Sequence, residues 1–231
     1  MINRKTVVAC FLLMMLSALC CGCSSESYKT GDGSLSYMRA DFVEAQTNGN
    51  ALVVSAVLDD GTTLSLAPTA KADWIKAKDS VYRALLYYNK VEGKSSITPV
   101  AISQVLVPKV VSDKSIVAAY PADPVTFETS WLSKTKRYLN LGIYLKIGSK
   151  DGTFGTQSLG FLHYDTVEQQ DGSRLYKIRL IHNQNVVPEY YSTQVYLSVP
   201  MYRLPFQIQE GDRIEIGVNT YNGYISKTFE M

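Results

Sequence analysis

Apolar and polar residues alternate along most of the chain beyond residue 36, with the period of two that half-buried β-strands show. In the first half, the alternating runs cover residues 38–42, 52–58, 64–66, 81–91 and 98–107. The sequences Asn48-Gly49-Asn50 and Asp60-Gly61 supply hairpin turns between the first three runs. The apolar faces predicted for the first two runs are Met38, Ala40 and Phe42, and Leu52, Val54, Ala56 and Leu58.

The stretch from Ala70 to Lys78 carries Trp74 and Ile75 among lysines and predicts one or two turns of helix. Three strands, a short helix and two strands are the element order of an OB-type barrel. An open five-stranded sheet with one covering helix would produce the same pattern. In the fourth run, alternation separates two faces, of which one must fill the core: Tyr82, Ala84, Leu86 and Tyr88 against Arg83, Leu85 and Tyr87.

The second half of the chain alternates more sharply and has no helical stretch. Its predicted inward positions are Leu139, Leu141, Ile143, Leu145 and Ile147, then Tyr176, Ile178 and Leu180, then Val195, Leu197 and Val199, then Ile214, Ile216 and Val218. Turn residues such as Asp151-Gly152 and Asp171-Gly172 separate these runs. Long alternating strands joined by turns are typical of an antiparallel β-sandwich.

Proline-rich sequence between the two halves marks a domain boundary, since Pro108, Pro121 and Pro124 bracket a segment of weaker alternation. We therefore expect an all-β chain. Its predicted parts are a lipoprotein signal peptide at 1–22, a flexible tether at 23–35, an OB-like five-stranded barrel at 36–108, a linker at 109–124 and a β-sandwich at 125–231.

The N-terminal sequence resembles a secretion signal that ends at a lipid-modified cysteine. Arg4 and Lys5 precede an apolar run of 13 residues, Val7–Leu19, which is shorter than the roughly 20 residues that a membrane-spanning helix needs. Cys23 follows the small residue Gly22 and is the predicted lipidation site, with Cys21 as the second choice. A simply cleaved signal with incidental cysteines is the alternative. Two or more acyl chains would hold the mature protein on a membrane.

Removal of residues 1–22 changes the charge balance of the protein. Lys plus Arg falls from 23 to 21, because Arg4 and Lys5 are lost, and Asp plus Glu stays at 21. A mature chain of about zero net charge lacks the basic surplus of a general nucleic-acid binder. All four cysteines lie in or at the end of the signal, which leaves no disulfide framework and no thiolate zinc site. We expect no metal, no cofactor and no nucleic-acid partner.

Catalytic chemistry has little support in the residue types available. His163 and His182 are the only histidines, both lie in strand-like runs, and no Gly-x-Ser-x-Gly turn is present. His163 and Asp165 would share a face of a strand, but a histidine on a sheet surface is the simpler interpretation. We assign no catalytic residue and expect that the protein is not an enzyme. The alternative is a glycan hydrolase that uses an unrecognised carboxylate pair.

Tyrosine is abundant, with 16 copies, and supplies flat amphipathic surfaces for contact with sugars or peptides. Most of these rings are expected to pack across strands. Tyr190 and Tyr191 differ, because they follow Pro188 in a predicted loop, and loops run over the surface. They are the predicted ligand-binding residues.

Four features occur in order over nearly all of the mature chain: the segment 37–43, the segment 81–89, Trp131 followed by 137–141, and the segment 219–223. In these segments the chain resembles the NigD-like lipoproteins of anaerobic Gram-negative gut and oral bacteria. The resemblance implies an N-terminal OB-like domain and a C-terminal β-sandwich. The family takes its name from a bacteriocin (nigrescin) operon and has no established activity, so the resemblance carries no functional residue.

These features together favour a protein anchored in the outer membrane through its N-terminal lipid. We expect a non-catalytic module that binds an envelope protein or a glycan, on either the surface or the periplasmic face. A bacteriocin-linked accessory or protective role is the second hypothesis.

Overall fold

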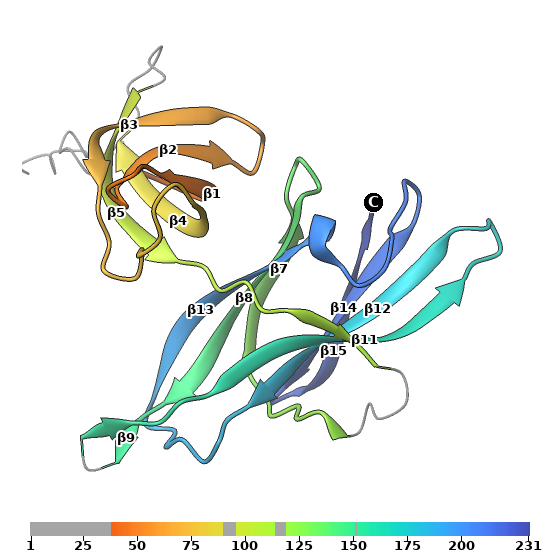
Figure 1. Ribbon diagram of the computed structural model, residues 1–231. Helices are drawn as coiled ribbons and strands as arrows, with labels where there is room; N and C mark the ends of the chain where they lie inside the picture. Colours follow the sequence, from red (N-terminus) through yellow and green to blue (C-terminus); the bar gives the residue numbers. More distant parts are fainter. Residues whose placement is uncertain (1–37, 90–95, 114–118, 151) are drawn as a thin grey trace, which may run out of the picture. The chain divides into compact units, whose positions relative to one another are not determined.

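A computed structural model describes residues 38–89, 96–113, 119–150 and 152–231. The first of its two folded parts is a closed barrel in which the strands follow the order β1-β2-β3-β5-β4 and β4 pairs with β1 (Figure 1). Its strands are β1 (Met38–Thr47), β2 (Val53–Leu58), β3 (Thr63–Ala70), β4 (Val81–Asn89) and β5 (Ser96–Gln104). This closed order of five strands confirms the predicted OB-like barrel.

The barrel core takes one predicted face from β4 and different faces from β1 and β2. Ala84, Leu86 and Tyr88 of β4 are fully buried, as the alternation predicts. In β1, however, the core takes Val43 and Ala45, so the predicted face containing Phe42 points away from the core. In β2, a shift in the pairing with β3 between Val53 and Ser55 breaks the alternation, and Val53 and Ala56 are the buried residues. A one-residue change in phase exchanges the faces of a strand.

The helix expected between Ala70 and Lys78 is absent, and this stretch forms turns instead. The Tyr82 hydroxyl accepts hydrogen bonds from the backbone N–H groups of Lys76 and Ala77, and the Thr47 hydroxyl donates to the carbonyl oxygen of Ala77. Side chains of the barrel thus satisfy backbone groups that a helix would have paired internally. Ile75 is buried in the barrel core, so packing on the barrel determines the conformation of this stretch.

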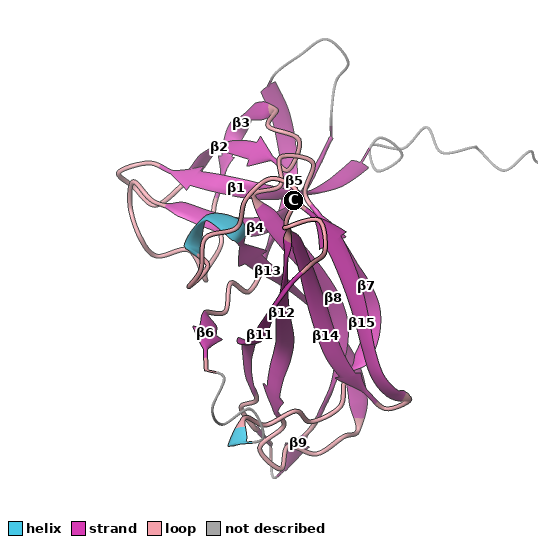
Figure 2. Cartoon of the chain, turned by 90° about the vertical axis from the view of Figure 1, so that its right-hand side faces the viewer, coloured by secondary structure: helices cyan, strands magenta, loops and turns pink. Residues whose placement is uncertain are grey.

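The second part is a sandwich of two sheets (Figure 2). Three strands form one sheet, in the order β13-β8-β7, with β7 at Thr126–Leu132, β8 at Tyr138–Ile147 and β13 at Tyr191–Pro200. Five strands form the other, in the order β15-β14-β12-β11-β6, with β6 at Val110–Ser112, β11 at Ser158–Glu168, β12 at Arg174–Asn183, β14 at Arg213–Thr220 and β15 at Gly223–Glu230. The short strands β9 (Ser149–Lys150) and β10 (Thr153–Phe154) form a small hairpin.

The sandwich core consists largely of the positions that alternation predicts. The buried residues shared with the prediction are Leu139, Leu141, Ile143 and Leu145 of β8, Ile178 and Leu180 of β12, Leu197 and Val199 of β13, and Ile214, Ile216 and Val218 of β14. The β-sandwich fold class is therefore confirmed, and apolar burial between the two sheets stabilises it.

Two pairings within the five-stranded sheet are parallel, whereas the sequence predicts an antiparallel sandwich. Strand β14 runs parallel to β12, and β6 runs parallel to β11. Between β12 and β14 the chain crosses to the other sheet as β13, and a parallel pair requires a connection of this length. Strand β6 lies in the segment 109–124 that we expected as a linker, so part of this segment belongs to the sheet.

No helix within the described ranges has both the length and the apolar character needed to cross a lipid bilayer.

Candidate functional site

A network of buried polar side chains connects the barrel to the sandwich, and Arg83 of β4 is its centre. The Arg83 guanidinium contacts both carboxylate oxygens of Asp59, at 2.7 Å and 2.8 Å. It also donates hydrogen bonds to the side-chain oxygens of Asn140 on β8 and Ser198 on β13, each at 3.1 Å. Asn140 donates in turn to Asp59, and Ser198 donates to Asn140. The Asp59 carboxylate thus compensates the buried charge of Arg83.

Aromatic rings surround this network. The Arg83 guanidinium lies 3.9 Å from the ring centroid of Tyr138, in cation–π geometry. Phe42 contacts Trp131 and Tyr196 of the sandwich edge-to-face, with centroid distances of 5.0 Å and 5.2 Å. Phe42 therefore packs against the sandwich, which explains why it does not belong to the barrel core.

A second ion pair lies at the edge of the same interface. Glu44 of β1 accepts hydrogen bonds from Arg137 at 2.9 Å and from the Tyr138 hydroxyl at 2.7 Å. Burial alone would raise the pKa of Glu44, but these hydrogen bonds and the charges of Arg137 and Arg83 outweigh it and hold the pKa below its ordinary value of 4.5. Burial and the hydrogen bonds to Tyr202 and Glu44 raise the pKa of Tyr138, so its phenol stays protonated.

Main-chain hydrogen bonds add to the connection between barrel and sandwich. The backbone N–H of Leu106 donates to the carbonyl oxygen of Tyr196, and the N–H of Ser198 donates to that of Leu106. The N–H of Thr135 donates to the carbonyl oxygen of Asp59 in the turn between β2 and β3. Side chains at this interface are thus held on a hydrogen-bonded frame, which favours a preorganised site.

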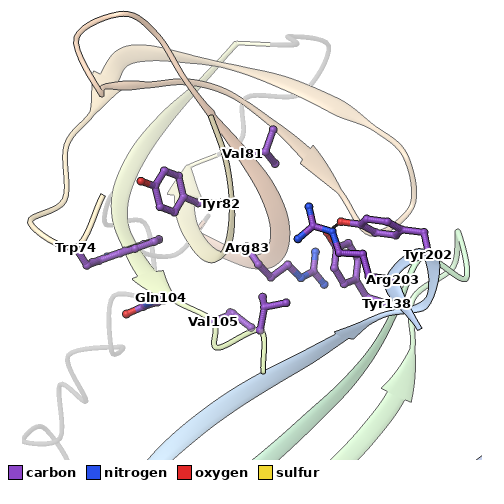
Figure 3. Close-up of a pocket in the computed structure, with 10 residues that line it drawn as sticks. Trp74, Val81, Tyr82, Arg83, Gln104, Val105, Tyr138, Tyr202 and Arg203 are labelled. Atoms are coloured by element: carbon purple, nitrogen blue, oxygen red, sulfur yellow. Dashed lines mark hydrogen bonds between the residues drawn. The ribbon is translucent and has the colours of Figure 1, made fainter. Parts of the chain in front are cut away.

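A pocket of about 350 Å³ opens beside this frame (Figure 3). Trp74 and Tyr82 lie on one side of it and Tyr202 and Arg203 on the other, while the Arg83 side chain extends toward Tyr138. The Trp74 and Tyr82 rings contact each other edge-to-face, at 5.6 Å between centroids. Val81, Gln104, Val105, Val107 and Tyr138 complete the lining. Aromatic walls with a few polar groups are typical of ligand pockets.

An acidic hollow of about 420 Å³ lies by Asp41, Asp59 and Asp60, with Phe42 and Trp131 also in its lining. These carboxylates do not form an acid–base pair. Asp59 pairs with Arg83, Asp41 accepts a hydrogen bond from the Tyr88 hydroxyl at 2.8 Å, and hydrogen bonds from Thr62 lower the pKa of Asp60. A glycosidase needs one carboxylic acid with a raised pKa. In the described part of the chain, the carboxyl groups with clearly shifted pKa values are all lowered, namely Glu44, Asp60, Asp171, Glu189 and Asp212.

Both histidines are buried in the sandwich, whereas we expected His163 on a sheet surface. The ring nitrogens of His163 lie 2.9 Å from the hydroxyls of Ser112 and Thr166. Those of His182 lie 3.0 Å from the carbonyl oxygen of Asp123 and 2.7 Å from the amide oxygen of Gln157. All four nitrogens therefore have protein partners. A register shift between His163 and Asp165 also breaks the alternation that would put these two residues on one face.

No cluster of metal-ligating residues occurs in the part of the chain that the structure describes.

Tyr190 and Tyr191, the predicted contact residues, lie at the opposite end of β13 from the pocket. Tyr191 begins β13 opposite Ile147, whereas Pro200 ends β13 next to Met201–Arg203. Tyr190 is 73% exposed and Tyr191 49% exposed. Lys146 forms an ion pair with Glu189 nearby, at 2.9 Å. The predicted lipidation site, Cys23, lies outside the described residues.

Local sequence pattern does not identify the interface residues as a site. The segments that carry the family resemblance nevertheless contain Phe42, Arg83, Trp131, Tyr138 and Asn140, which all meet at this interface. A second signal is the strand β8, whose polar-face residues Tyr138 and Asn140 are buried together with its apolar face. A buried polar face in an otherwise alternating strand indicates a second packing partner.

Residues 108–231 match the family model of the NigD-like C-terminal beta sandwich domain. No curated protein matches the chain. Among solved structures, a NigD-like immunity protein from Bacteroides caccae ATCC 43185 is similar, with a TM-score of 0.60 and 19% identity over 83% of this chain and 97% of that one. A provisionally assigned toxin-related protein from Parabacteroides distasonis ATCC 8503 has a TM-score of 0.63 and 19% identity, over 84% and 93%. A provisionally assigned lipoprotein from Bacteroides fragilis NCTC 9343 has a TM-score of 0.54 and 12% identity, over 84% and 96%. At these identities, the similarity shows the fold.

Proposed function

We propose that this chain, which belongs to the NigD-like family, is a non-catalytic binding protein of the cell envelope, because the resemblance to that family provides no catalytic residue. Its binding site is the pocket beside Arg83, and its ligand is an envelope protein or glycan. The single observation that carries the proposal is the combination of aromatic walls with a hydrogen-bonded frame. Trp74, Tyr82 and Tyr202 are presented by elements that the Arg83 network holds together. Such preorganisation reduces the entropy lost on binding.

We propose that the protein is not catalytic because its candidate carboxyl groups and histidines are engaged by other groups of the fold. Asp59 is paired with Arg83 and Asp41 accepts a hydrogen bond from Tyr88, and the imidazole nitrogens are hydrogen-bonded inside the sandwich. Neither set supplies the paired acid and base that hydrolysis of a glycan needs. Release of sugar from envelope polysaccharides by the purified mature protein would contradict this part of the proposal.

The lipid anchor is proposed at Cys23, at the outer membrane. The provisionally assigned lipoprotein of similar fold supports an anchor of this kind. Residues 24–37 separate Cys23 from β1, and 14 residues span at most about 50 Å. The pocket would thus work close to the membrane. We expect Cys23→Ala to move the protein from the membrane fraction to the soluble fraction, with Cys21→Ala as the matched control. Retention of Cys23→Ala in membranes would exclude this position.

A bacteriocin-linked protective role is the second candidate function. One protein of similar fold is named a NigD-like immunity protein, and this name favours the candidate. A strain that lacks the gene should then become more sensitive to a bacteriocin of a neighbouring strain, and the intact gene should restore resistance. Equal sensitivity of both strains across a bacteriocin panel would count against protection.

Tyr190 and Tyr191 are proposed as a second contact surface, at the other end of the sandwich from the pocket. Both are exposed, Tyr190 in the loop before β13 and Tyr191 as the first residue of β13, and tyrosines are enriched in recognition surfaces. This surface provides a natural control for the pocket.

The deciding experiment is crosslinking followed by affinity purification of tagged full-length protein from native membranes. Two double variants are compared with the wild type: Tyr202→Ala with Arg203→Ala at the pocket, and Tyr190→Ala with Tyr191→Ala at the distant surface. All four side chains are exposed, so both variants should fold. A protein or glycan that the pocket variant loses and the other variant keeps would support the pocket. Retention by the pocket variant would refute it.

A further inference from the structure

A second hollow adjoins the pocket and shares two of its lining residues, and we call the two hollows together the groove. This second hollow has a volume of about 300 Å³ and is lined by Val107, Pro108, Lys109, Val110, Pro200 and Arg203. Val107 and Arg203 line both hollows. The groove therefore runs from Trp74 past Arg203 to Lys109.

The charge along this groove is positive. Lys109 and Arg203 are both exposed, and neither has a carboxylate within 4.0 Å in the part of the chain that the structure describes. Arg83 and Arg137, by contrast, are paired with Asp59 and Glu44. The groove thus offers two cations that are available to a ligand, and carboxylates are their complement.

The walls beside these cations are largely aliphatic. Val81 lines the first hollow and Val107 lines both, and both are exposed large hydrophobic residues. Pro108, Val110 and Pro200 continue the apolar lining in the second hollow. Aliphatic walls suit the alternating side chains of an extended polypeptide. Trp74 at the far end provides a flat surface for a larger apolar side chain.

We propose that this groove binds an extended, acidic peptide segment of a partner protein, with carboxylates at Lys109 and Arg203 and apolar side chains against the valines and prolines. The inference rests on the proposed function, since it names the ligand class of the same site. The peptide enters the groove lengthwise, and alternate side chains meet the charged and the apolar positions.

The test is selection from a phage-displayed library of random ten-residue peptides on immobilised residues 24–231, the mature chain without the predicted lipid-bearing Cys23. We expect the wild type to enrich peptides that contain Asp and Glu together with aliphatic residues. The variant Lys109→Glu with Arg203→Glu reverses the charge of the groove and should instead enrich Lys and Arg. The variant Tyr190→Ala with Tyr191→Ala should select the same acidic peptides as the wild type. Enrichment without acidic bias, no enrichment, or an unchanged selection by the charge-reversed variant would each overturn the inference.

A parallel titration separates failure of this inference from failure of the proposed function. The probe is an acidic oligosaccharide, oligogalacturonate, measured by calorimetry against the wild type and the charge-reversed variant. We expect no binding to either. Binding that the charge-reversed variant loses would leave the pocket as a binding site and replace the peptide with a glycan. The membrane crosslinking experiment decides independently whether the pocket has a partner at all.

Discussion

The guanidinium of Arg83 lies 2.7 Å from a carboxylate oxygen of Asp59, and this ion pair joins strand β4 to the turn between β2 and β3. The same guanidinium reaches Asn140 and Ser198 in the sandwich. A single side chain of the barrel is therefore hydrogen-bonded to both folded parts, and the candidate pocket lies beside it.

Removal of Arg83 should be strongly destabilising. The Arg83 side chain is 2% exposed, so Arg83→Ala leaves Asp59 without its cationic partner and removes one donor from Asn140. We expect the free energy of unfolding to fall by about 3–5 kcal/mol, the cost of breaking a buried pair by removing one partner. Urea denaturation of the mature protein measures this change.

The matched control is Arg137→Ala, since the Arg137 side chain also pairs with a carboxylate but is 51% exposed. We expect a loss of no more than about 1 kcal/mol, as for other surface pairs. Equal losses in the two variants would show that the Arg83 network does not stabilise the interface more than a surface pair does.

Glu44 should make the protein sensitive to acid. Its pKa in the folded protein lies below the ordinary value of 4.5, so its ionised form stabilises the fold above that pH. The stabilisation is lost as the pH falls through the folded-state pKa. Glu44→Gln should have a lower Tm than the wild type at neutral pH, and the difference should shrink between about pH 5 and about pH 3. A difference in Tm that is constant over this range would contradict the assignment.

Asp212 should stabilise the turn that precedes β14. Its buried carboxylate accepts hydrogen bonds from the backbone N–H groups of Arg174 and Gln209, both at 2.8 Å. Asp212→Ala leaves both donors without this acceptor, and we expect the free energy of unfolding to fall by about 2–3 kcal/mol. Asp171→Ala is the control, because Asp171 is exposed and should contribute little. Equal losses in the free energy of unfolding of the two variants, measured by chemical denaturation, would refute the prediction.

Gly148 should tolerate no larger side chain. A Cβ atom at this position would lie 2.7 Å from the carbonyl oxygen of Pro188 and 2.9 Å from the Tyr190 ring. Gly148→Ala should lower the free energy of unfolding by about 1–3 kcal/mol through overpacking. At Gly160, a Cβ would make only ordinary contacts with Ile181, at 3.6 Å, and Gly160→Ala should cause no loss. Thermal denaturation that shows equal stability for both variants would contradict the crowding at Gly148.

Much of the sandwich follows from local pattern. In β8 and β14, one face is buried between two sheets, so strand alternation is sufficient to identify Leu141, Ile143, Ile214 and Ile216 as core residues. The barrel core departs from simple alternation, because Phe42 is apolar but packs on the sandwich, and a shift in pairing moves Val53 into the core. Pattern alone does not distinguish burial in a core from burial in an interface.

The candidate site depends on contacts between distant parts of the chain. Asp59, Arg83, Asn140 and Ser198 come from three strands and a turn, and their hydrogen bonds join residues up to 115 positions apart. No local spacing could predict that set, because strand order and the docking of the barrel determine which residues meet. The same reason explains why Tyr190 and Tyr191 stand out in the sequence and Tyr202 and Arg203 do not.

Local sequence predicts the all-β class, five strands in the first half and a sandwich in the second, because strand alternation and turn residues need no knowledge of distant neighbours. Closure of the five strands into a barrel is a tertiary feature. Three further features emerge only in the folded chain: Arg83 is buried between the barrel and the sandwich, both histidines are enclosed, and a pocket with aromatic walls opens beside Arg83. The physical reason is that burial and pairing of a polar side chain depend on which distant surface covers it.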